Sequence, residues 1–274
     1  MRPARLLTVF LLIGLLAGCA TNPSTGRSQL LLFSAAEVNA MGEGAAPQVI
    51  AEFGGEVDSQ PLRAYVDGVG RTLARHVEPD YRGLNWEFFV LDSEVVNAFA
   101  LPGGKIFITR GLLERFDNEA QVAGVLGHEI GHVTARHVNE RLSQTFITQG
   151  LVGIIDESTE SELVVLGADV AASTIMLRYS RRDENEADRQ GVKYMTAAGY
   201  NPRGMIEVLE VLESASGEGR PPEFLSTHPY PESRIRDMQS LLTDRYAYTQ
   251  DNPEYRKHPG RFDREAAPYL QGGR

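Results

Sequence analysis

Two histidines four residues apart, His128 and His132, are the residues of this sequence whose spacing most clearly permits chemistry. In an α-helix such residues differ by about 40° in azimuth and lie ~6 Å apart along the axis, so both imidazoles leave one face. They can therefore bind a single Zn²⁺. Glu129 lies about 100° from His128 on that helix, where it can act as general base for a water attacking a zinc-polarised peptide carbonyl. The spacing also occurs by chance in unrelated helices, so the interpretation depends on a third ligand.

A histidine further along the same helix does not supply that ligand. Glycine three residues after His132 and histidine six residues after it would be needed, but the sequence has Ala135 and Val138 there. His137 falls about 180° from His128 on a continuous helix, so we expect it to pack or to make a hydrogen bond near the site. The third ligand must therefore come from another helix.

Glu184, in the charged segment 179–188, is the best candidate for the third ligand. Glu184 and Asp188 are one helical turn apart, so one carboxylate can bind zinc while the other supports a ligating histidine or the reacting water. Glu186 lies about 200° from Glu184 and is expected to point elsewhere. Such acids can also simply solvate a helix face that alternates with arginines. Together with the histidine pair, they predict one Zn²⁺ per chain.

Four elements, in this order, resemble the zinc metallopeptidases of the HtpX and CaaX-prenyl-protease type, peptidase family M48, and especially their bacterial lipoprotein members. The elements are NAFALPGG at 97–104, HEIGH at 128–132, YSRRDENEAD at 179–188, and Thr227-His228-Pro229 with Arg234. The resemblance extends from about residue 22 to Arg234 and implies that Glu184 is the third zinc ligand. It also implies that Asp188 is a supporting or proton-donating acid.

The same resemblance implies roles for three further parts of the chain. His228 would lie near the metal, where it either stabilises the oxyanion or caps zinc in a resting state, and Arg234 would orient one of the acids. Segment 97–100 would be an edge strand beside the cleft, able to bind an extended peptide through main-chain hydrogen bonds. Outside this family, a histidine before proline is often a turn residue, and the strand could simply precede a turn.

The surrounding pattern predicts a mostly helical α+β domain of gluzincin type, with a small mixed β-sheet beside the HExxH helix. Apolar and aromatic residues at 86–91 and 105–109 predict strands. Ser34 with Glu37 forms a capping box that begins a helix, and Asp117 is expected to cap the helix that carries the motif. The remaining expected helices cover 60–77, 117–142, two segments within 143–180, and 181–198.

The start of the chain predicts its compartment. Arg2 and Arg5 precede an apolar run at 6–16, and small residues lead to Cys19, the only cysteine. We expect residues 1–18 to be a lipoprotein signal peptide, too short to span a bilayer, and Cys19 to carry the lipid. Ala20 after the cysteine, by resemblance to known lipoproteins, suggests the periplasmic side of the bacterial outer membrane.

The rest of the chain is expected to form three parts: a lipidated tether with a short apolar segment at 19–33, a zinc metallopeptidase domain at 34–242, and a polar tail at 243–274. Because the tail lacks apolar periodicity, we expect it to be poorly ordered or draped over the surface. The net charge of −10 disfavours nucleic acid and anionic lipid as partners. Membrane attachment would therefore depend on the lipid.

The function expected from these features is endopeptidase action on unfolded or misassembled cell-envelope proteins. The alternative is a chaperone-like assembly factor for outer-membrane proteins, acting with the envelope assembly machinery and carrying a latent or mainly structural zinc site. Structural zinc sites are usually closed by four protein ligands, whereas catalytic sites keep one position open. His228 is the residue that could make the site either kind.

Overall fold

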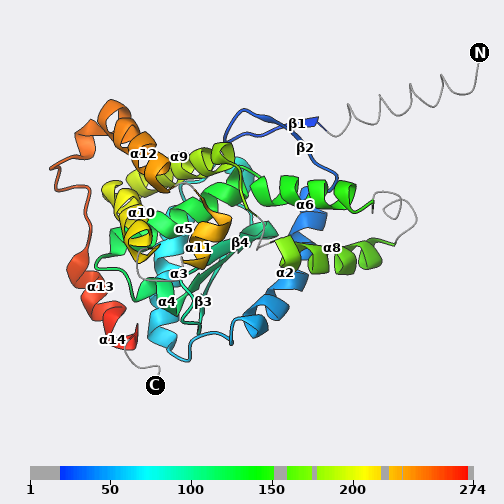
Figure 1. Ribbon diagram of the computed structural model, residues 1–274, viewed down its shortest axis with the longest axis horizontal. Coiled ribbons are helices and arrows are strands. Elements are labelled where there is room, and N and C mark those ends of the chain that lie inside the picture. Colours follow the sequence, from blue (N-terminus) through cyan, green and yellow to red (C-terminus); the bar gives the residue numbers. More distant parts are fainter. Residues whose placement is uncertain (1–18, 151–158, 175–177, 217–221, 230, 271–274) are drawn as a thin grey trace, which may run out of the picture.

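Helices surround a small mixed sheet in the computed structural model (Figure 1), which confirms the expected mostly helical α+β class. The structure describes residues 19–150, 159–174, 178–216, 222–229 and 231–270. The expected signal peptide at 1–18 lies outside these residues. Within the described ranges, every helix is too short or too polar to serve as a membrane-crossing segment. Lipid attachment at Cys19 stays a prediction.

The sheet has the order β3-β5-β4, with β3 at Glu87–Leu91, β4 at Ala98–Leu101 and β5 at Lys105–Thr109. β3 runs parallel to β5, and β4 runs antiparallel to it. The turn between β4 and β5 is the 3₁₀ segment η2 at Pro102–Gly104, where Gly103 takes a φ of 78° that side chains resist. Both predicted strands are present, and segment 97–100 does form an edge strand.

Alternate residues of β5 face two separate apolar cores. Ile106 and Ile108 belong to the larger core, and Phe107 belongs to the smaller one. The larger core is covered by α3 (Gln60–Ala74), α5 (Glu119–Thr134), α9 (Arg181–Ala197), α10 (Arg203–Ala215) and α12 (Pro231–Arg245). The smaller core is covered by α2 (Ala35–Glu52), α6 (His137–Thr148) and α8 (Glu160–Thr174). The remaining short elements before the C-terminal segment are η1 (Pro79–Tyr81), α4 (Arg110–Leu113) and α11 (Glu223–Thr227).

Side-chain caps begin the helices that matter for the site. Ser34 and Glu37 form the expected capping box of α2, and Ser180 with Asp183 forms another at the start of α9. The cap of α5 is one residue later than predicted, because Asn118 rather than Asp117 accepts a hydrogen bond from a first-turn backbone N–H. These caps fix where α5 and α9 begin and therefore which residues face each other.

The prediction of one helix that continues to about Leu142 is wrong, because two helices cover this stretch. Arg136 adopts the left-handed region (φ 58°), α5 ends before it and α6 starts after it. Two buried side chains from the N-terminal segment compensate the break: Asn22 donates to the carbonyl of Thr134 at 3.0 Å, and Gln29 donates to that of Ala135 at 2.7 Å. Carbonyls released at a helix end need such donors.

The segment 19–33, expected to be a lipidated tether with a short apolar segment, lies against the rest of the described chain. It forms a hairpin of β1 (Cys19–Thr21) and β2 (Ser28–Leu30), which lies against the α5–α6 junction (Figure 1). Asn22 and Gln29 are buried, and Phe33 packs edge-on against Phe146 of α6. Burial of hydrogen-bonded polar side chains makes this segment part of the domain.

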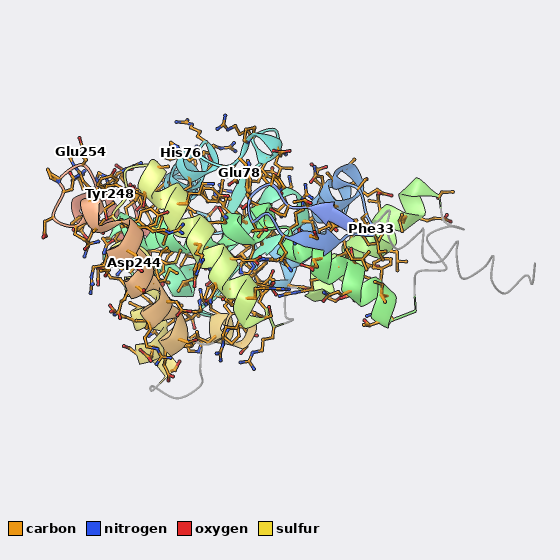
Figure 2. The ribbon with its side chains drawn as sticks, turned by 90° about the horizontal axis from the view of Figure 1, so that it is seen from above. Phe33, His76, Glu78, Asp244, Tyr248 and Glu254 are labelled. Carbon is orange, nitrogen blue, oxygen red and sulfur yellow. The ribbon has the colours of Figure 1, made fainter. Side chains whose placement is uncertain are left out.

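The part of the C-terminal segment that the structure describes, up to Leu270, packs against the rest of the domain. It contains η4 (Ala247–Thr249), α13 (Pro259–Glu265) and α14 (Ala267–Leu270). Phe262 and Leu270 join the larger core, and the carbonyl of Lys257 accepts from Ala120 at the start of α5. Figure 2 shows Tyr248 of this segment at the opposite end of the molecule from Phe33.

Candidate metal centre

The helices α5 and α9 approach closely because glycines face each other at their crossing. A Cβ on Gly131 would lie 2.6 Å from the carbonyl oxygen of Ala187, and one on Gly127 would lie 3.3 Å from the backbone of Gly191. A side chain at Gly131 would therefore force the two backbones apart. This contact lets α9 present Glu184 to the histidines of α5, as the sequence predicted.

Four side chains converge at this crossing. The Nε2 atoms of His128 and His132 are 3.0 Å apart. Glu184 Oε2 lies 3.7 Å from His128 Nε2, and Glu184 Oε1 lies 3.5 Å from His132 Nε2. His228 joins the group, with its Nδ1 3.2 Å from His128 Nε2 and 3.1 Å from Glu184 Oε1. All four side chains are buried, and one ligand atom from each lies within 4.8 Å of the others.

Hydrogen bonds at the Nδ1 atoms of His128 and His132 determine whether their Nε2 atoms carry a proton or a lone pair. His128 Nδ1 lies 2.8 Å from Asp188 Oδ1, and because an ionised carboxylate only accepts, Nδ1 carries the proton. His137 Nε2 likewise donates to Glu186 at 3.0 Å, so its Nδ1 accepts from His132 Nδ1 at 3.0 Å. Both Nε2 atoms then present lone pairs toward each other and toward Glu184. This donor set fits a metal cation.

The charges of the site agree with that conclusion. Burial and Arg234 act to lower the pKa of His128, but Asp188 and Glu184 outweigh them and raise it. Burial holds the pKa of His132 well below its ordinary value, which keeps that ring neutral. Metal ligands must be deprotonated. His132 therefore presents a ready ligand, and the acids around His128 attract a proton or a metal ion to the same point.

Arg234 of α12 holds both acids of α9. Its Nε and Nη2 donate to the two oxygens of Asp188 at 2.8 and 2.7 Å, and its Nη1 lies 2.6 Å from Glu184 Oε2. Burial acts to raise the pKa of Glu184, yet Arg234 and His228 hold it well below the ordinary value. Arg234, expected to orient one of the acids, thus contacts Asp188 and Glu184 together.

Glu129 is the least compensated charge of the centre. It is fully buried, and neither carboxylate oxygen has a hydrogen-bond partner among the described residues. The Nε2 atom of His228 lies 3.7 Å from Glu129 Oε1. Burial raises the pKa of Glu129. A buried, unpaired carboxylate with a raised pKa is suited to accept a proton from water or substrate.

The ring of His228 is held by its neighbours. It stacks on Phe224 with centroids 4.3 Å apart, and its backbone N–H donates to the Phe224 carbonyl. The ring centroid of Tyr179 lies 5.1 Å from that of His228, and the Tyr179 backbone N–H donates to the carbonyl of Thr227. The structure places His228 beside His128 and Glu184. Its Nδ1 faces them while its Nε2 faces Glu129.

Two side chains of the centre were missed as contributors. The ring of Tyr179 stacks on His132 with centroids 3.9 Å apart, and the guanidinium carbon of Arg141 lies 3.3 Å from the Tyr179 centroid. Tyr179 stands in the charged motif, but its type gave no metal-binding role. Arg141 on α6 had no sequence signal, since its approach depends on the break at Arg136. The hydrogen bond expected for His137 is confirmed.

Comparisons with known proteins agree with this geometry. The family model described as peptidase family M48 matches residues 61–242. The Escherichia coli protein named beta-barrel assembly-enhancing protease is 33% identical over 189 residues, which are 65% of this chain and 38% of that protein. The mitochondrial metalloendopeptidase OMA1 of Schizosaccharomyces pombe is 31% identical over 208 residues, 74% of this chain and 60% of that protein.

An OMA1 protein of Arabidopsis thaliana is 36% identical over 170 residues, covering 62% of this chain and 33% of the relative. The chain therefore spans less than two thirds of each of these relatives. The matched region contains both histidines of α5, Glu184 of α9, His228 and Arg234. On the match of the family model and on the convergence of these side chains, this chain belongs to peptidase family M48.

Proposed function

We propose that this protein is a zinc-dependent endopeptidase. The observation that carries the proposal is the convergence of His128, His132 and Glu184 beside the unpaired carboxylate of Glu129. Two imidazoles and one carboxylate are a common protein ligand set for catalytic zinc. When bound there, zinc would supply a Lewis acid for a substrate carbonyl and would lower the pKa of water.

The chain's own residues divide the remaining work. Glu129 takes the proton of the attacking water, because burial raises its pKa and no hydrogen bond within the described chain stabilises its charge. Asp188 and Arg234 hold His128 and Glu184 in place before substrate arrives. His228 Nε2, which also lacks a hydrogen-bond partner among the described residues, can donate to an oxyanion that forms on the Glu129 side.

The substrates we propose are unfolded or misassembled proteins of the cell envelope. β4 is an edge strand whose Ala98–Leu101 backbone pairs on one side with β5, and α5 packs against it. An edge strand recognises extended backbone with little sequence selectivity, which suits unfolded chains. The Escherichia coli relative is named beta-barrel assembly-enhancing protease, and this name supports the envelope as the place of action.

For location, we propose attachment to the periplasmic side of the bacterial outer membrane through a lipid on Cys19. The support is the apolar run and small residues that precede this cysteine in the sequence. Metabolic labelling with a fatty-acid analogue tests it. Label on the wild-type protein and none on Cys19→Ser is expected, whereas equal labelling of both would contradict the anchor.

The test of the peptidase compares the full chain with Glu129→Gln on an unfolded protein substrate, with zinc content measured in parallel. Glu129→Gln is expected to lose roughly 10²- to 10⁴-fold in rate because general-base catalysis contributes that much. Its zinc content should stay at one per chain, since Glu129 is not a ligand. Glu213→Gln, on the exposed face of α10, is the matched control. Cleavage by Glu129→Gln at the wild-type rate would refute the proposal.

A second candidate is supported by His228, which brings a fourth donor to the group. Four protein ligands would close the site, as in structural zinc sites, and would fit a chaperone-like assembly factor with a latent centre. Zinc coordination measured by X-ray absorption, together with cleavage by His228→Ala, separates the two. Activity that rises on substitution identifies His228 as a plug, and activity that collapses identifies it as catalytic.

A further inference from the structure

We propose that His137, Glu186 and Arg27 form a positioning relay that fixes the ring of His132 for metal binding. The relay rests on the metal site proposed above. It involves none of the residues expected to be ligands other than His132. It also reaches Arg27, which lies in the N-terminal hairpin and outside the matched region 61–242.

The relay runs in one hydrogen-bonding direction. Glu186 Oε2 accepts from His137 Nε2 at 3.0 Å, which leaves His137 Nδ1 as an acceptor. That atom lies 3.0 Å from His132 Nδ1, which must then donate. His132 thereby keeps its proton on Nδ1 and turns the lone pair of Nε2 toward His128, 3.0 Å away. A hydrogen bond to the far nitrogen orients a ligating ring and raises its basicity.

The break at Arg136 is what brings His137 into this place. On a continuous helix its side chain would point away from His132, whereas the left-handed residue redirects the chain at the start of α6. His137 is buried, and its ring centroid lies 5.0 Å from that of His132. The break therefore serves the metal centre and not only the packing of α6.

Arg27 keeps the outer end of the relay in position. Its Nε lies 3.2 Å from Glu186 Oε2, and its Nη2 lies 3.6 Å from Asp183 Oδ1. Without this cation, Glu186 and Asp183 would face each other beside one imidazole, because Asp183 Oδ1 is also 3.7 Å from His137 Nε2. Repulsion would then move Glu186 off His137. The Arg27 guanidinium therefore favours the arrangement in which Glu186 stays hydrogen-bonded to His137.

Arg27 is also held by a second acid, Glu140, which is not itself part of the relay. Glu140 accepts from Nη1 at 3.2 Å and from Nη2 at 2.6 Å, a bidentate pair. Its side chain is 18% exposed and that of Glu186 is 20% exposed, so the two acids are equally buried partners of one arginine. Only Glu186 contacts His137. Glu140 therefore offers a comparison in which a charge beside Arg27 is lost while the acceptor of His137 stays in place.

The first experiment measures zinc affinity of the full chain by competition with a chromophoric chelator. Glu186→Met, which removes the acceptor and keeps the length, is expected to weaken zinc binding by roughly 10- to 100-fold, the usual effect of losing such a partner. Glu140→Met, which keeps the Glu186 acceptor on His137, should weaken binding less than Glu186→Met does. His137→Phe should weaken binding similarly, and His137→Asn, which keeps an acceptor near His132, should recover part of the loss. Equal affinities for all variants would overturn the relay.

The second experiment does not need metal. Nitrogen chemical shifts of ¹⁵N-labelled histidine in the metal-free protein report which nitrogen carries the proton. Wild type should show His132 protonated on Nδ1 and His137 protonated on Nε2, and Glu186→Met should lose the second preference. A proton on Nε2 of His132 in wild type would overturn the relay. Wild type with the expected tautomers but no zinc affinity would instead contradict the proposed function while leaving the relay supported.

Discussion

The two ends of α5 carry buried charges that are compensated in different ways. At its start, Glu119 is buried and its Oε1 accepts from Tyr200 at 2.9 Å and from Arg261 at 3.0 Å. At its other end, His128 and His132 direct lone pairs at each other and at Glu184. In the first cluster the cation lies at the one carboxylate, whereas the second, which also contains Arg234, still gathers four side chains with donor atoms around one point.

This difference separates a structural charge cluster from a functional one. A buried ion pair that the chain completes itself stabilises the fold little but is costly to break. A buried group of acceptors that converges on one point favours binding of an external cation. The comparison predicts that metal acts on the second cluster alone, and that substitutions in the first affect folding without affecting metal.

The largest expected effect is that of metal removal. With free zinc about 1,000-fold above the dissociation constant, binding stabilises the folded state by about 4 kcal/mol, and a chelator should remove this along with peptidase activity. Thermal unfolding with and without chelator measures it. Re-addition of zinc should restore both quantities. An unchanged melting temperature after complete zinc removal would contradict the distinction between the two ends of α5.

Next in size is Gly131→Ala, which tests whether the second cluster depends on the α5–α9 contact. The new Cβ would meet the Ala187 carbonyl, and overpacking of this kind costs about 1–3 kcal/mol. Because α9 carries Glu184, zinc affinity should fall as well. Gly68→Ala in α3, where a Cβ meets nothing within 4 Å, is the control and should not lower stability. Equal melting temperatures for the two variants would show that the contact does not require glycine.

Arg261→Ala should have a smaller effect and should act on the first cluster only. It leaves Glu119 buried without its cation, although water can enter because the Arg261 side chain is 39% exposed. We therefore expect a loss of about 1–3 kcal/mol in urea unfolding. Zinc affinity should equal that of wild type. A fall in zinc affinity would show that the two ends of α5 are coupled.

The smallest expected effect concerns Glu78, a carboxylate whose hydrogen-bond partners all come from the chain itself. Burial acts to raise the pKa of Glu78, but hydrogen bonds from Lys193, Tyr194 and Ser24 lower it overall. A depressed folded-state pKa contributes stability above the unfolded value, near 4.5, and this contribution is lost as pH falls through the folded-state pKa.

The unfolding free energy of wild type should therefore decline more steeply below pH 4.5 than that of Glu78→Gln. The difference should stay under about 1 kcal/mol, because the side chain of its partner Lys193 is 48% exposed and solvent screens the pair. Urea titrations across this pH range measure it, with Glu232→Gln as an exposed control. Parallel curves for wild type and Glu78→Gln would show that the hydrogen bonds to Glu78 do not stabilise the folded state.

The sequence was most informative where chemistry is local. His128 and His132 share a helix face by helical geometry alone, and Glu184 with Asp188 repeats that spacing on a second helix. It was least informative where polar residues become buried. Asn22 and Gln29 have the composition of an exposed tether, and nothing near them in sequence indicates that they donate to carbonyls more than 100 positions away.

The sequence by itself thus determined the metal-binding residue types, the helices that carry them, the sheet strands and the family. The tertiary structure alone decided that α5 breaks at Arg136, that His137 supports His132, and that Arg27 and Arg261 complete separate acidic clusters. The physical reason is the separation in sequence over which each kind of interaction acts. Backbone periodicity is set by neighbouring residues, whereas the partner of a buried charge or carbonyl is chosen by the packing of segments distant in the chain.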